Sequence, residues 1–143
     1  MILVENKSKQ KLPLELFEKI VAELKIIQDI ELLIVDNETI AKLNKQFRNK
    51  EEATDVLSFP LQSSTPYIPL GSIVISIDKA KEGAKKYHHL VSDELTLLFI
   101  HGLLHLIGYD HETDNGQMRK KEEELIEKFH LPSSLIVRSE KEN

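Results

Sequence analysis

The chain has 143 residues, of which 41% are hydrophobic, enough for a compact core of ordinary domain size. It has no cysteines, so disulfides and thiolate metal sites are excluded, and any metal must be held by His, Asp or Glu. The net charge of −5 argues against broad, sequence-independent nucleic-acid binding, although a local basic cleft is compatible with it. We therefore expect one globular domain over residues 1–143.

The first half of the chain is predicted to alternate strands and helices. A short strand over residues 2–5 precedes a helix over 13–25, in which apolar residues recur at helical spacing. A strand rich in β-branched residues over 30–36 leads directly into a helix over 37–48. Asp36 is the expected N-cap of this second helix.

The middle of the chain is predicted to form two strands and a helix. A strand over 54–59 stops at Pro60, and a loop containing prolines and a glycine leads to a strictly alternating strand over 72–77. Asp78 is then expected to cap a helix that runs through Tyr87.

Two further helices complete the prediction. A long helix is expected from Ser92 or Asp93 to about His105, with Gly108 ending it, and a last helix over 114–129. The charged run RKKEEELIEK within the last helix is interpreted as a solvated face. The mixed order predicts an α+β fold, in which a small mixed β-sheet packs against helices and the long central helix carries histidines.

No segment of the chain predicts export or a membrane span. The N-terminal MILVENKSKQ turns charged after a few apolar residues, unlike a secretory signal. The longest apolar run, LTLLFIHGLLHLIG, carries two histidines and is too short to cross a bilayer comfortably. We expect a cytoplasmic protein with no membrane partner.

Three of the six histidines lie within HGLLHLIGYDH, residues 101–111. His101 and His105 are four residues apart on a predicted helix, so both rings lie on one face. Gly108 allows the chain to turn back and deliver His111. Three neutral imidazoles leave one position of a tetrahedral zinc ion open, as catalytic sites do. We predict one bound Zn²⁺, although the same ligands also suit nickel, cobalt or copper.

The spacing matches the metzincin zinc motif, H-E-x-x-H-x-x-G-x-x-H, except at its second residue. Metalloproteases need a glutamate there as general base, and this chain has Gly102. Asp110 and Glu112 flank the third histidine and could either orient a ligand ring or be solvated. The neighbouring pair His88 and His89 is interpreted as exposed loop residues.

The histidine segment resembles the signature of the bacterial YbeY family, metal-dependent endoribonucleases of ribosomal RNA maturation. Two further segments, LNKQFRNKEEATDVLSFP and GSIVIS, are similar to family blocks in the same order, and the resemblance covers about residues 30–127. Two positions depart from the family pattern: Ser72 stands where an acidic residue is usual, and Ala53 where proline is common.

The resemblance implies a function for specific residues. It makes His101, His105 and His111 the zinc ligands, and Arg48 a functional arginine in the active-site cleft. From the residues alone, Arg48 ends a charged helix and could be solvated, yet its guanidinium suits bidentate binding of phosphate. Asp55 and Ser58 could line the same cleft.

The resemblance also implies a substrate and partners: ribosomal RNA near the 3′ end of the small-subunit RNA, and the small ribosomal subunit or its assembly factors, with no DNA partner. We therefore expect a zinc-dependent, single-strand-directed endoribonuclease that uses metal-activated water or the RNA 2′-hydroxyl as nucleophile. The alternatives are another metal-dependent hydrolase, such as a peptidase or esterase, and a non-catalytic assembly factor stabilised by zinc.

Overall fold

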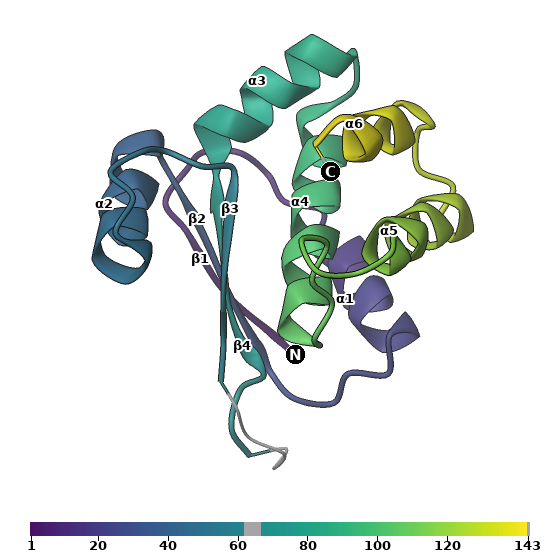
Figure 1. Cartoon of the computed structure of the whole chain (residues 1–143), viewed down its shortest axis with the longest axis horizontal. Coiled ribbons are helices and arrows are strands. Elements are labelled where there is room, and N and C mark those ends of the chain that lie inside the picture. Colours follow the sequence, from purple (N-terminus) through teal and green to yellow (C-terminus); the bar gives the residue numbers. More distant parts are fainter. Residues whose placement is uncertain (62–66, 143) are drawn as a thin grey trace.

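The computed structural model describes residues 1–61 and 67–142, and part of the loop expected after Pro60 lies outside this range. Its described strands form one sheet in the order β1-β2-β4-β3 (Figure 1). The strands are β1 (Ile2–Asn6), β2 (Ile30–Val35), β3 (Val56–Pro60) and β4 (Gly71–Ser76). The first three in sheet order are parallel, and β3 pairs antiparallel with β4. The predicted mixed sheet is confirmed, and Pro60 is accommodated because β3 is an edge strand.

Helices cover both faces of the sheet unequally. They are α1 (Leu14–Glu23), α2 (Asn37–Arg48), α3 (Ile77–Tyr87), α4 (Val91–Leu106), α5 (Gln117–Lys128) and α6 (Ser134–Glu142). Figure 1 shows α2 against one face, while α1, α4, α5 and α6 lie on the other side. No helix in the described part of the chain is long and apolar enough to cross a membrane.

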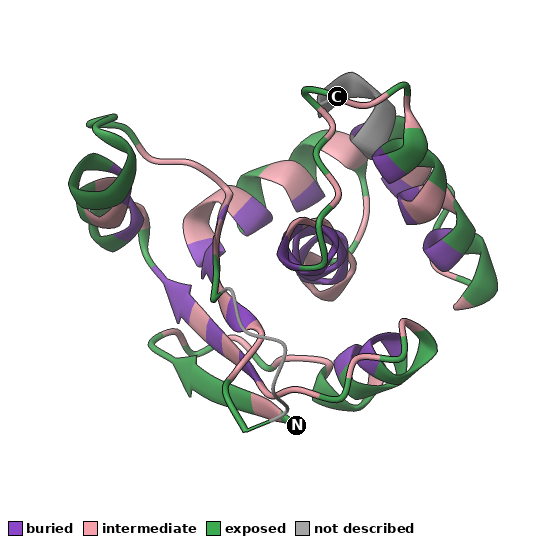
Figure 2. Cartoon of the chain, turned by 60° about the horizontal axis from the view of Figure 1, so that its bottom comes forward, coloured by how far each residue is buried: buried purple, intermediate pink, exposed green. Residues whose placement is uncertain are grey.

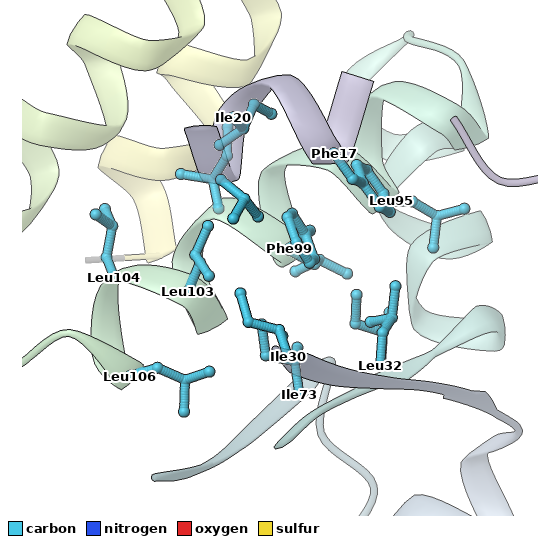
Figure 3. Close-up of a cluster of buried hydrophobic side chains, with 14 of the residues drawn as sticks. Phe17, Ile20, Ile30, Leu32, Ile73, Leu95, Phe99, Leu103, Leu104 and Leu106 are labelled. Atoms are coloured by element: carbon cyan, nitrogen blue, oxygen red, sulfur yellow. The ribbon is translucent and has the colours of Figure 1, made fainter. Parts of the chain in front are cut away.

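Helix α4 is the centre of the larger layer. Most of its residues are buried, including all of Leu95–Ile100, and Figure 2 shows it enclosed by the sheet and the other helices. Such an apolar surface on every side is typical of a helix with no solvent face. Phe99 stacks on Phe17 of α1 with ring centroids 4.3 Å apart (Figure 3). The histidines of α4 are therefore carried by the most rigidly packed element of the fold.

The predicted start of α2 is correct, whereas those of α3, α4 and α5 are shifted, the last of them from residue 114 to Gln117. Asp36 caps α2, since its carboxylate accepts a hydrogen bond from the N–H of Thr39 at 2.8 Å. Helix α3 is capped by Ser76, whereas Asp78 accepts a backbone N–H from the start of α2. Helix α4 begins at Val91, earlier than expected, because the Asp93 carboxylate reaches back to the N–H of the residue before the helix.

Helix α6 was not predicted. It packs onto α4 and α5 through a small cluster in which Leu97, Ile126 and Leu135 are buried. Its apolar positions are few, and it follows a Leu-Pro-Ser-Ser segment that favours a turn. Tertiary packing, more than local sequence preference, therefore accounts for this helix.

Candidate metal centre

The predicted histidine cluster is present. Helix α4 places His101 and His105 on one face near its end, and Gly108 turns the chain back with a φ of +105°. This turn brings His111 beside them, so that one ligand nitrogen from each ring lies within 4.8 Å of the other two. All three rings are half-buried, and the arrangement can hold a metal ion.

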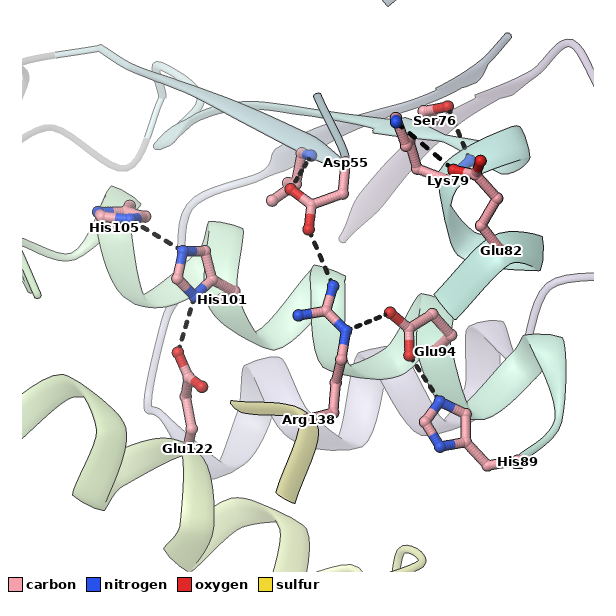
Figure 4. Close-up of polar contacts among 11 residues, drawn as sticks. Asp55, Ser76, Lys79, Glu82, His89, Glu94, His101, His105, Glu122 and Arg138 are labelled. Carbon is pink, nitrogen blue, oxygen red and sulfur yellow. Dashed lines mark hydrogen bonds and ion pairs between the residues drawn. The ribbon is translucent and has the colours of Figure 1, made fainter. Parts of the chain in front are cut away.

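The hydrogen bonds of two rings fit a cation between them (Figure 4). The His105 Nδ1 lies 3.0 Å from the carbonyl oxygen of Tyr109, and the His101 Nδ1 lies 2.8 Å from a Glu122 carboxylate oxygen. Both partners accept hydrogen bonds, so each Nδ1 carries the proton and each Nε2 presents a lone pair. These two Nε2 atoms are 3.2 Å apart. Tetrahedral zinc with N ligands at about 2.1 Å would separate them by about 3.4 Å.

The third ring gives independent support. The His111 Nδ1 is buried and has no hydrogen-bond partner among the described residues.

Burial and the neighbouring His101 lower the pKa of His105, because both disfavour a positive charge on its ring. Its neutral form, the form that binds metal, therefore persists to lower pH than usual. The donor set fits a metal ion bound by neutral imidazoles.

Glu122 is a candidate site residue that the sequence interpretation missed. It belongs to the charged run assigned to a solvated face, yet its side chain is only 1% exposed. Met118, Leu125 and Ile126 are buried on the same face of α5. Glu122 lies four residues after Met118 and three before Leu125, so it belongs to the apolar stripe of the helix. This spacing is the signal that could have identified it. A buried carboxylate on that stripe needs a partner, and His101 provides it.

We expect Glu122→Gln to weaken zinc binding about tenfold to a hundredfold, because the carboxylate fixes the tautomer and raises the basicity of His101. Competition with a chromogenic chelator would measure this change. Glu124→Gln is the matched control, since Glu124 lies on the same helix but is 54% exposed and pairs with Lys121. Equal affinities for the two variants would contradict the assignment.

The three histidines lie in a cleft of about 620 Å³. The same cleft is lined by Arg48 at the end of α2, Asp55 just before β3, and Ser58 in the middle of β3. Asp110 and Glu112 also line it, but the Asp110 carboxylate accepts the Glu112 N–H instead of orienting a histidine ring. The structure therefore brings together residues from four separate segments that the sequence interpretation had singled out.

Gly102 marks the closest approach of α4 to the sheet. A Cβ at this position would lie 2.8 Å from Ile73 Cγ2 and 3.2 Å from Ser58 Oγ. The Ser58 hydroxyl also donates a hydrogen bond to the Gly102 carbonyl, at 3.1 Å. A glutamate could not occupy this position without moving the sheet. The glutamate that serves metzincins as general base is thus absent from this position, and the packing leaves no space for it.

A second buried polar group adjoins the cleft (Figure 4). Arg138 of α6 donates from Nε to Glu94 at 2.7 Å and from Nη2 to Asp55 at 2.9 Å. The other Glu94 oxygen lies 2.6 Å from His89 Nε2. The interpretation of His89 as exposed was wrong, since its side chain is 1% exposed, whereas His88 is exposed as expected. These links join elements that local sequence patterns could not connect.

The comparison with protein families decides the assignment. A family model described as Endoribonuclease YbeY matches residues 3–130. The chain belongs to the YbeY family. The match includes all three histidines, Arg48 and Glu122, and ends before Arg138.

Individual relatives support the same membership. A protein of Nautilia profundicola named Endoribonuclease YbeY is 68% identical over 113 residues, covering 79% of this chain and 81% of the relative. Proteins with the same name from a Sulfurovum species and Helicobacter pylori are 53% and 49% identical, and each alignment covers 98% of this chain. The same alignments cover 98% of the Sulfurovum protein and 99% of the Helicobacter pylori protein.

A solved structure supports the fold. The solution structure of a Thermotoga maritima protein, 26% identical, superposes with a TM-score of 0.59 over 99% of this chain and 93% of that one. The expected α+β architecture is therefore found in a protein that is only distantly similar in sequence.

Proposed function

We propose that this chain is a zinc-dependent endoribonuclease that cleaves single-stranded segments of ribosomal RNA. One observation carries the proposal: a three-histidine cluster and Arg48 share a single cleft in a chain of the YbeY family. Three histidine ligands that leave a fourth position open are typical of catalytic zinc sites. The resemblance of the sequence blocks supports a role in maturing the 3′ end of the small-subunit RNA in the cytoplasm. The partners would be the small ribosomal subunit or its assembly factors.

Each residue of the site has a chemical role in this proposal. His101, His105 and His111 would hold the ion, which when bound supplies a Lewis acid for a phosphate oxygen and acidifies water. Glu122 and the Tyr109 carbonyl keep two rings oriented with Nε2 toward the ion site. Arg48 is exposed at the cleft and presents several N–H donors, suited to two oxygens of one phosphate. Its charge would stabilise the phosphodiester as negative charge develops during cleavage.

The geometry disfavours a peptidase, since the position of its general base is filled by contacts between Gly102 and the sheet. It leaves two nucleophiles for RNA cleavage, water and the 2′-hydroxyl. End-group analysis of the products separates them: a 2′,3′-cyclic phosphate would identify attack by the 2′-hydroxyl.

We expect Arg48→Ala to lower kcat/KM for a single-stranded RNA about tenfold to a hundredfold, as for the loss of hydrogen bonds to a charged group. Cleavage of a labelled RNA by the zinc-loaded protein would measure the effect. Arg119→Ala is the control, because Arg119 is exposed on α5 and does not line the cleft. Full activity of Arg48→Ala would refute the role of Arg48. Lack of RNA cleavage by the native, zinc-loaded chain would refute the proposed function.

A further inference from the structure

We propose that Asp55, held in place by Arg138, forms a subsite for a ribose 2′-hydroxyl of the strand bound in the cleft. The inference rests on the proposed function, since it assumes that RNA occupies the cleft. It adds a residue that distinguishes RNA from DNA, separate from the metal ligands and from Arg48.

The carboxylate of Asp55 is fixed but retains accepting capacity. Its Oδ1 accepts the N–H of Val56 at 2.8 Å, and its Oδ2 accepts Nη2 of Arg138 at 2.9 Å. A carboxylate offers about four acceptor positions, so these two bonds set its orientation without exhausting it. The side chain is 31% exposed and lines the cleft. A donor entering the cleft can therefore reach it.

The support behind Asp55 is buried and charged. The Arg138 side chain is 7% exposed, and it is bound in turn by Glu94, whose side chain is fully buried. Gly83 of α3 leaves room for Glu94, because a Cβ there would collide with its carboxylate. Since the Asp55 orientation is set before any ligand binds, binding need not pay the entropy of ordering it.

The charges of this wall favour a hydrogen-bond donor over a phosphate. The positive charge of Arg138 is flanked by the two carboxylates of Glu94 and Asp55, so the wall has no excess positive charge with which to attract phosphate. An ionised carboxylate only accepts hydrogen bonds. Along a nucleic-acid backbone, the 2′-hydroxyl is the donor that lies next to each phosphate, and DNA lacks it. Arg48 lines the same cleft and suits that phosphate.

The test compares binding of single-stranded RNA and DNA of one sequence by fluorescence anisotropy, with a gel to confirm that the strands stay intact. The native chain should prefer RNA, and Asp55→Ala should reduce the ratio of the two Kd values about tenfold, as expected for one hydrogen bond to a charged group. Affinity for DNA should be unchanged or higher, because a negative charge is removed. Asp55→Asn should keep part of the preference, since its amide oxygen still accepts.

Glu112→Ala is the matched control, because it removes a negative charge from an exposed residue of the same cleft. It should change RNA and DNA binding alike. An unchanged RNA preference in Asp55→Ala would overturn the inference. A preference of the native chain that depends on the amino groups of the bases and not on the sugar would also overturn it. Native protein that binds neither strand would instead show that the proposed function is wrong, and the subsite with it.

Discussion

Replacing His105 with alanine will lower the zinc affinity of the chain more than a hundredfold and abolish its cleavage of RNA. The loss of an outer partner of a ligand costs about tenfold to a hundredfold, so the loss of the ligand itself costs more. His105 lies next to both other rings. Its Nε2 is 3.2 Å from that of His101, and its ring centroid is 5.5 Å from that of His111. Elemental analysis should find about one equivalent of zinc in the native protein and almost none in the variant.

His88→Asn is the control for this prediction. His88 is exposed and has a φ of +58°, a conformation that asparagine tolerates, so the variant should keep its zinc and its activity. Circular dichroism would establish whether His105→Ala is folded. A folded variant that retains full zinc would contradict the assigned site. An unfolded one, together with a fully active Arg48→Ala, would favour a purely structural zinc.

Replacing Arg138 with methionine will lower the free energy of unfolding by about 3–5 kcal/mol, because it leaves the buried Glu94 carboxylate without its guanidinium. For a chain of this size, the loss corresponds to a decrease in Tm of about 10–17 °C. Thermal unfolding followed by circular dichroism would measure it.

Two variants show whether the burial of the charge is the cause. Lys128→Met removes an ion pair with Glu23 in which the lysine is 57% exposed, and it should cost less than about 1 kcal/mol. Glu94→Gln combined with Arg138→Met should recover part of the lost stability, because the buried carboxylate that lost its guanidinium is then gone. If Arg138→Met were as mild as Lys128→Met, the network would contribute nothing to stability.

The histidine cluster could be predicted because its geometry is local. Four residues along a helix fix the relation of His101 to His105, and Gly108 gives the chain the positive φ that returns His111 to them. The sheet was predictable for a similar reason, since each strand has its own pattern of apolar residues. The parallel pairing of β2 with both β1 and β4 required the fold itself.

The rest of the site depends on contacts that no local pattern contains. Arg138 meets Glu94 and Asp55 across 44 and 83 residues of sequence, and His101 meets Glu122 across 21. Charged residues are usually solvated, and Glu122 was assigned to a solvated face on that basis. The assignment was wrong, as was the prediction that His89 is exposed. The partner of Glu122 lies on another helix, and His89, in the connection between α3 and α4, has its partners on α4 and α6.

The docking of α6 has a consequence for the motions of the molecule. Separation of α6 from α4 would take the guanidinium away from the fully buried Glu94 and leave it only His89, and would release Asp55 just before β3. Because this opening has a large electrostatic cost, we expect α6, α4 and the β3 edge to exchange their amide protons as one cooperative unit. The bonds of Arg138 to two separate elements therefore fix the shape of this wall of the cleft in the absence of a ligand.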